Sequence, residues 1–221
     1  MDYNSEFYNA CLKGHLEVAK QLVESYPQIN VSAGNNYAFR SACRNGHLEV
    51  AKWLVNFHPS IIDISANISN AFIDACRNNH LKVAKWLIQL YPTTIDVSAY
   101  NNIAFQCACV NGHLKVAQWL VELYPSVVNI FANDNKAFRG ACVHGRIEVA
   151  KWLVDIRPYH YMIELDQSQT QILSWRIRPI EEIKEIKWLE RAVPILAYNS
   201  KTLNIFQTLN YDTMRYICEF V

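Results

Sequence analysis

The sequence lacks the features that mark membrane, secreted and nucleic-acid-binding proteins. Its 221 residues carry a net charge of +1, so no strong field attracts nucleic acid or a membrane surface. No apolar run approaches the roughly 20 residues of a membrane-spanning helix. The N-terminal stretch MDYNSEFYNACLKG does not join a basic segment to an apolar one, so we expect no secretory signal. We therefore expect neither nucleic acid nor a membrane as a partner.

Motifs for catalysis are missing as well. The chain has no glycine-rich phosphate loop, no nucleophile elbow and no GKS or GKT sequence. The sequence thus gives no positive evidence for an enzyme or for a bound cofactor.

The sequence also lacks the cysteine spacing of a disulfide framework. Five of its seven cysteines occupy one equivalent place in a repeated segment, and these are Cys11, Cys43, Cys76, Cys109 and Cys142. Disulfide frameworks do not place one cysteine per repeat inside amphipathic helices. Reduced, small apolar side chains are the simpler interpretation, which predicts a reducing, intracellular location.

What the chain does have is a segment that recurs five times. The copies are LKGHLEVAKQL, RNGHLEVAKWL, RNNHLKVAKWL, VNGHLKVAQWL and VHGRIEVAKWL, around His15, His47, His80, His113 and Arg146. The steps between these positions are 32, 33, 33 and 33 residues. An aromatic residue and an Ala-Cys pair precede each copy, and a proline follows it. Such self-similarity at a fixed period indicates a repeat architecture.

Each unit predicts a helix, a turn, a second helix and an extended loop. Phe39, Ala42 and Cys43 lie at i, i+3 and i+4, on one face of a short helix. Gly46 then tolerates the left-handed conformation that ends a helix. The apolar stripe of LEVAKWL forms the second helix, which Pro59 ends. The segments between units, such as TTIDVSAYNN, are β-branched and rich in Asn, which predicts a short extended finger with a turn.

A pair of helices and a turn every 33 residues resembles the ankyrin repeat. The resemblance runs from about Phe7 to Pro158. It is carried by AC..GH, where the family has AA..GH, and by LEVAKWL, which matches the family's second helix. The family's TPLH opening is replaced by YAFR, NAFI, IAFQ and KAFR, so packing of Phe and Trp is expected to carry more of the stability. The whole pattern, with YP closing the helices, resembles the multi-copy ankyrin proteins of giant DNA viruses of amoebae. That resemblance implies the cytoplasm of a host cell.

We therefore predict an all-α fold, an ankyrin-repeat α-solenoid with a helical C-terminal cap. Residues 1–158 are expected to form five repeats, at about 1–32, 33–65, 66–98, 99–131 and 132–158. Residues 159–221 are expected to form a degenerate sixth repeat and the cap. Within 165–198, QILSWRI is interpreted as a decayed first helix, and EIKEIKWLERA around Trp188 as the second.

Two recurring patterns could indicate chemistry, but framework roles explain them better. Cysteine and histidine recur four residues apart in four units, yet one unit offers two ligands and a structural zinc site needs four. We expect no metal there, and we interpret the histidines as turn and inter-repeat hydrogen-bonding groups. A ladder of tryptophans could stack bases, but each lies beside the apolar stripe, so we expect burial between neighbouring repeats. The ladder consists of Trp53, Trp86, Trp119 and Trp152.

The ankyrin resemblance implies a partner-binding surface on the concave side, lined by the first helices and the finger tips. Candidate residues are those at positions that vary while the frame around them repeats. They are Lys13, Arg44, Asn45, Asn67, Asp74, Arg77, Asn78, Tyr100, Asn102, Val110, Asn111, Asn133, Asn135 and His144. Arg44, Arg77 and Tyr100 are expected to dominate, because Arg and Tyr are the usual anchors of interfaces.

The predicted function is a monomeric, non-catalytic module that binds a protein partner of unknown identity. An alternative is a substrate adaptor. The segment LNYDTMRYICEF resembles the F-box-like start that some viral ankyrin proteins use to recruit a ubiquitin ligase. The sequence leaves open whether the tail recruits such a ligase or only covers the end of the stack.

Overall fold

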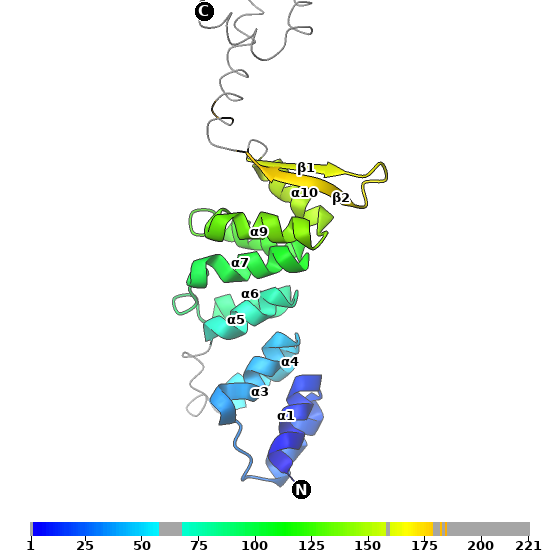
Figure 1. Cartoon of the computed structure of the whole chain (residues 1–221). Helices are drawn as coiled ribbons and strands as arrows, with labels where there is room; N and C mark the ends of the chain where they lie inside the picture. Colours follow the sequence, from blue (N-terminus) through cyan, green and yellow to red (C-terminus); the bar gives the residue numbers. More distant parts are fainter. Residues whose placement is uncertain (1, 58–67, 158–159, 179–181, 183, 185–221) are drawn as a thin grey trace, which may run out of the picture. The chain divides into compact units, whose positions relative to one another are not determined.

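The structure is a computed structural model that describes residues 2–57, 68–157, 160–178, 182 and 184 (Figure 1). The chain divides into two compact units, Met1–Lys151 and Trp152–Val221, and the last helix of the repeats spans the division. Asn67, Trp188 and the F-box-like segment lie outside the described residues.

Five helix pairs follow one another along the chain up to Ile156 (Figure 1). The first helices of the pairs are α1 (Tyr3–Lys13), α3 (Ala33–Arg44), α5 (Ile68–Arg77), α7 (Ala99–Asn111) and α9 (Ala132–Val143). The second helices are α2 (Leu16–Ser25), α4 (Leu48–Phe57), α6 (Leu81–Leu90), α8 (Leu114–Leu123) and α10 (Ile147–Ile156). Along this series each first helix contacts the next, from α1 to α9. These contacts confirm the predicted stack of helix pairs.

The core of the stack is built from the same positions in every unit. The recurring Phe inside each first helix is at most 1% exposed, and the Ala and Cys that follow it are buried. In α4, Val50, Ala51 and Leu54 supply the other side of the core. Burying one such Phe or Leu side chain contributes about 2 kcal/mol, and the contribution is repeated in each unit.

The histidine at the start of α4, α6 and α8 reaches back to the preceding unit. The Nε2–H of His47 donates to the carbonyl of Leu12 over 2.9 Å, and that of His113 donates to the carbonyl of Arg77 over 2.9 Å. The His47 ring fills the space that a Cβ on Gly14 would occupy. The prediction that these histidines are inter-repeat hydrogen-bonding groups is confirmed.

The tryptophans also join neighbouring units, although less deeply than expected. The rings of Phe7 and Trp53 lie 6.4 Å apart, and those of Phe72 and Trp119 lie 6.3 Å apart. Each of these pairs joins a first helix to the second helix of the next unit. The indoles are only half-buried, because they cover the edge of the core and do not enter it.

The loops between units are not the extended fingers that the sequence predicts. In the described loops no residue is in a strand, and three consecutive residues at 34–36, 100–102 and 133–135 are left-handed, with φ from 51° to 65°. All of these residues except Tyr100 are Gly, Asn or Asp, the types that tolerate this conformation best. The β-branched residues just before each run point inward, as the buried Ile95 and Val97 do.

The prediction of a helical cap is wrong where the structure describes the C-terminal region. Strands β1 (Tyr161–Leu165) and β2 (Ile172–Ile177) form an antiparallel hairpin, so the fold is mostly helical and not all-α. The loop is closed locally by Asp166, whose carboxylate accepts from the backbone N–H groups of Thr170 and Gln171, both at 2.6 Å. The Ser168 hydroxyl and these amides lower the pKa of Asp166 to about 2. This turn, together with Ile and Trp in β2, favours strands over a decayed helix.

Candidate partner-binding surface

The predicted anchors lie on the exposed sides of the first helices, which we call the first-helix surface. Lys13, Arg44 and Arg77 are exposed in the last turns of α1, α3 and α5, where a cation also interacts favourably with the helix dipole. Tyr100 is 71% exposed in a left-handed run at the start of α7. The helix ends and the loop geometry bring Arg44, Arg77 and Tyr100 to one hollow, whereas Lys13 lines a different one.

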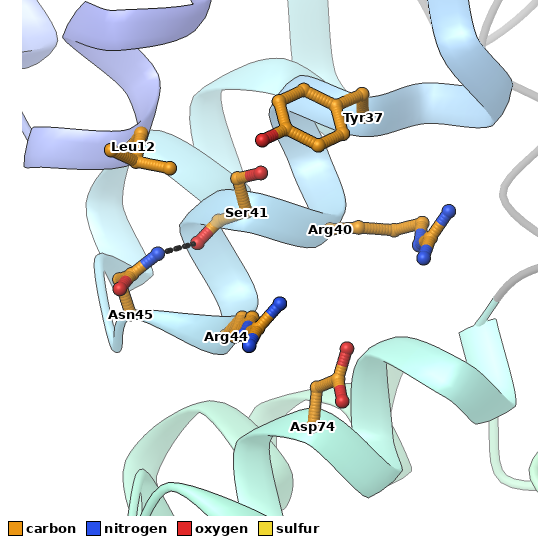
Figure 2. Close-up of a pocket in the computed structure, with 7 residues that line it drawn as sticks. All are labelled: Leu12, Tyr37, Arg40, Ser41, Arg44, Asn45 and Asp74. Atoms are coloured by element: carbon orange, nitrogen blue, oxygen red, sulfur yellow. Dashed lines mark hydrogen bonds between the residues drawn. The ribbon is translucent and has the colours of Figure 1, made fainter.

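Two adjoining hollows on this surface share Arg40, Arg44 and Asp74, and we call the two together the arginine hollow. One, of about 220 Å³, is lined by Leu12, Tyr37, Arg40, Ser41, Arg44, Asn45 and Asp74 (Figure 2). The other, of about 440 Å³, is lined by Arg40, Arg44, Asn70, Ile73, Asp74, Arg77, Tyr100 and Ile103. In Figure 2, Arg40 and Arg44 extend from α3 on the side of Asp74, which belongs to α5.

The charges in the arginine hollow do not cancel. Asp74 pairs with Arg77 over 3.2 Å, and the Nε–H of Arg77 also donates to Cys107 Sγ over 3.4 Å. Arg44 forms no ion pair with any residue that the structure describes. The Nε of Arg40 is buried and has no hydrogen-bond partner among the same residues. Two guanidinium groups are therefore available to an external acceptor.

Several predicted site residues have structural roles. Asn102 is 5% exposed, and its Oδ1 accepts from the backbone N–H of Asn129 over 3.1 Å. Its side chain is therefore closed to a partner, because it holds the following loop. The amides that end α3, α5 and α7 donate to the carbonyl four residues earlier, at 2.8, 2.8 and 2.9 Å. These amides belong to Asn45, Asn78 and Asn111.

The remaining predicted residues are spread over the C-terminal units. Asn133 and His144 are exposed, whereas Val110 and Asn135 are half-buried. Asn133 Nδ2 donates to Oε1 of the buried Gln106 over 3.2 Å, so part of its amide is already engaged. The structure does not bring these side chains into the arginine hollow.

Arg40 is the residue of the hollow that the sequence analysis missed, together with its neighbour Tyr37. The signal was present, because the last position of YAFR, NAFI, IAFQ and KAFR changes from unit to unit. In the fourth unit this position is Gln106, whose Nε2 donates to the Asn101 carbonyl over 2.5 Å. A variable position can therefore be a structural residue in one unit and a surface residue in another.

The recurring cysteines are not poised for thiolate chemistry. Burial raises the pKa of Cys11 and of Cys142 to about 12, and it raises those of Cys43, Cys76 and Cys109 as well. Thiols with such pKa values remain protonated and are weak ligands and nucleophiles. Within the described ranges, no group of three or more His, Cys, Asp or Glu side chains is placed to hold a metal ion. The described helices also include none long and apolar enough to cross a membrane.

Comparison with protein families identifies the repeated segment. Residues 7–101 match the model of ankyrin repeats in three copies. A comparison with curated proteins found no match. The resemblance to viral proteins is not supported by these comparisons and stays a prediction. The ankyrin family is typically non-catalytic. The match therefore identifies ankyrin repeats in residues 7–101, and helix pairs of the same kind continue in α7 to α10.

Proposed function

We propose that this chain binds a protein partner through its first-helix surface, as a monomer and without catalysing a reaction. Ankyrin repeats are in general protein–protein interaction modules. The observation that carries the choice of surface is the arginine hollow, which Arg40 and Arg44 line beside the exposed Tyr100. Arg and Tyr are enriched among the residues that contribute most to binding energy.

The second helices offer a weaker case for recognition. In α2 and α4 the charges pair along one turn, as Lys20–Glu17 at 2.8 Å and Lys52–Glu49 at 3.0 Å. Such exposed pairs characterise a solvated surface and contribute little energy. The second helices do expose Leu90 and Leu123, which makes them the rival surface for an experiment to test.

The buried, protonated thiols of the repeats fit a reducing compartment. We therefore include an intracellular location in the proposal, because an oxidising compartment would favour disulfides in a secreted domain.

Site-specific photo-crosslinking in the cells that naturally produce the protein tests the choice of surface. A benzoylphenylalanine replaces Tyr100 in one variant and Leu123 in the other, since both side chains are large and exposed. We expect a discrete crosslinked protein from position 100 and none from position 123. Crosslinks from position 123 alone, or none from position 100, would contradict the proposal.

A further inference from the structure

We propose that the arginine hollow receives an acidic side chain of the partner, from a peptide segment in which apolar residues flank the acid. The inference rests on the proposed function, because it names the chemistry of the partner at the same surface. Three features of the hollow support it: its charge, an unsatisfied buried donor and the aromatic and apolar side chains in its lining.

The charge of the hollow fits one or two carboxylates. Three arginines and one aspartate line its two parts, and Asp74 is already engaged by Arg77 over 3.2 Å. Arg40 and Arg44 stand one helical turn apart on α3, so both guanidinium groups can approach one site. Guanidinium groups bind carboxylates through paired, charge-assisted hydrogen bonds, which are among the strongest in proteins.

The buried Nε of Arg40 points to the same ligand. This N–H group has been removed from water and finds no acceptor among the described residues. A buried donor without an acceptor is costly, and a positioned acceptor recovers that cost. A carboxylate in the hollow supplies such an acceptor.

The lining of both parts of the hollow includes apolar or aromatic side chains. Leu12 and Tyr37 line one part, and Tyr37 is 46% exposed. Tyr100 and Ile103 line the other part, and Tyr100 is 71% exposed. Tyr side chains add contact area at a low cost in conformational entropy. A peptide with apolar or aromatic residues on both sides of its acid therefore fits the two parts of the hollow.

The limited length of the basic stretch favours a peptide over a nucleic acid. The positions equivalent to Arg44 and Arg77 in the next two units are Val110 and Val143. A nucleic-acid backbone presents a phosphate at every nucleotide and is held by a continuous basic groove. The arginines cover two units only, which matches a short acidic segment.

Selection from a phage library of short random peptides tests the inference on the full chain. We expect the selected peptides to carry Asp or Glu between apolar residues. A synthetic copy of a selected peptide should bind about tenfold more weakly to the R40Q/R44Q/R77Q variant. The binding should also weaken as salt is added, because ion pairs near the surface are screened. The K82Q/K85Q/K115Q variant removes the same charge from α6 and α8 and should bind within about twofold of the parent chain.

Circular dichroism shows whether each variant is folded, and R44Q alone serves if the triple variant is not. Selected peptides without an excess of acids, no selected peptides at all, or equal binding by a folded arginine variant would overturn the inference. An oligothymidylate that binds in the same arginine-dependent way would overturn it in favour of nucleic acid. If the inference fails while crosslinking from position 100 persists, the proposed function stands and only the acidic partner is wrong.

Discussion

At the scale of single residues, the contact between a histidine and the preceding unit explains why NGH recurs. The glycine is left-handed, with φ of 81° at Gly46, and a Cβ there would overlap the His80 ring. Where Arg146 replaces the histidine, its Nε–H makes the same contact by donating to the carbonyl of Val110 over 3.2 Å. The motif is therefore a contact between units. A metal site would not tolerate the replacement of a histidine ligand by arginine.

Replacement of His47 by alanine tests this contact. The change removes the bond from Nε2 to the Leu12 carbonyl and should lower the free energy of unfolding by about 1 kcal/mol. His15 occupies the same place in the first unit and is exposed, so His15→Ala is the matched control and should have little effect. Urea denaturation of both variants measures the difference, and equal losses would show that the contact contributes nothing.

The histidine contacts should also make stability depend on pH. Burial lowers the pKa of His80 and of His113 below the ordinary value of 6.5, although each ring donates to a backbone carbonyl. Positive charge nearby acts in the same direction, from His47 and His113 on His80 and from Arg146 on His113. The folded state thus binds these protons less readily than the unfolded state.

The contribution of these contacts is therefore present above pH 6.5 and is lost as pH falls through the folded pKa values. Thermal denaturation between about pH 7.5 and about pH 5.5 should show a falling midpoint, before most carboxylates titrate. The H80Q/H113Q variant should show a smaller fall, whereas H144Q changes an exposed histidine and should behave as the parent chain. An unchanged pH dependence in H80Q/H113Q would contradict this assignment.

At the scale of elements, the left-handed runs set where each first helix begins. The runs at 34–36, 100–102 and 133–135 turn the chain from a loop with buried β-branched residues into the helix. Side chains also link successive runs, since Asn101 Nδ2 donates to Asn133 Oδ1 over 3.3 Å. These Asn-rich tips therefore hold the loops in place as well as facing solvent.

Asn35 provides a direct test of the backbone requirement, because it is exposed and has φ of 55°. Asn35→Ala should destabilise the protein by about 1 kcal/mol, since alanine is strained in this conformation. Asn35→Gly should cause no comparable loss, because glycine adopts positive φ readily. If both variants unfold at the same denaturant concentration, the left-handed run does not constrain the fold.

The helix pairs could be predicted from the sequence because their apolar positions recur at helical spacing in five aligned copies. Phe39, Cys43 and Leu54 are buried as their positions indicate. The β-hairpin could not be predicted from the same pattern, because it depends on a local turn at Asp166 and has no repeated copy to compare. The sequence suggested that Asn102 is a surface residue. Its burial could not be predicted, because it depends on the following loop, to which its side chain is hydrogen-bonded.

At the scale of the whole molecule, one regular frame supports a surface that changes from unit to unit. The buried positions are nearly the same in each unit, whereas the exposed ends of the first helices change from Arg44 and Arg77 to Val110 and Val143. Repeats stabilise one another through neighbouring contacts, so exposed positions can vary with little effect on the fold. Recognition is therefore expected where the chain varies, and the first-helix surface combines such variation with the guanidinium groups of Arg40 and Arg44, which are unpaired among the described residues.

The most direct test measures the affinity of the partner captured through position 100 for two matched variants. R44A/R77A/Y100A removes two cations and one large exposed side chain from the first-helix surface. K82A/K115A/L123A removes the same kinds of groups from α6 and α8. We predict that the first variant weakens binding at least about tenfold, the effect of a single moderate anchor, and that the second leaves it within about twofold. Unchanged affinity in the first variant, with the fold intact, would show that the partner binds elsewhere.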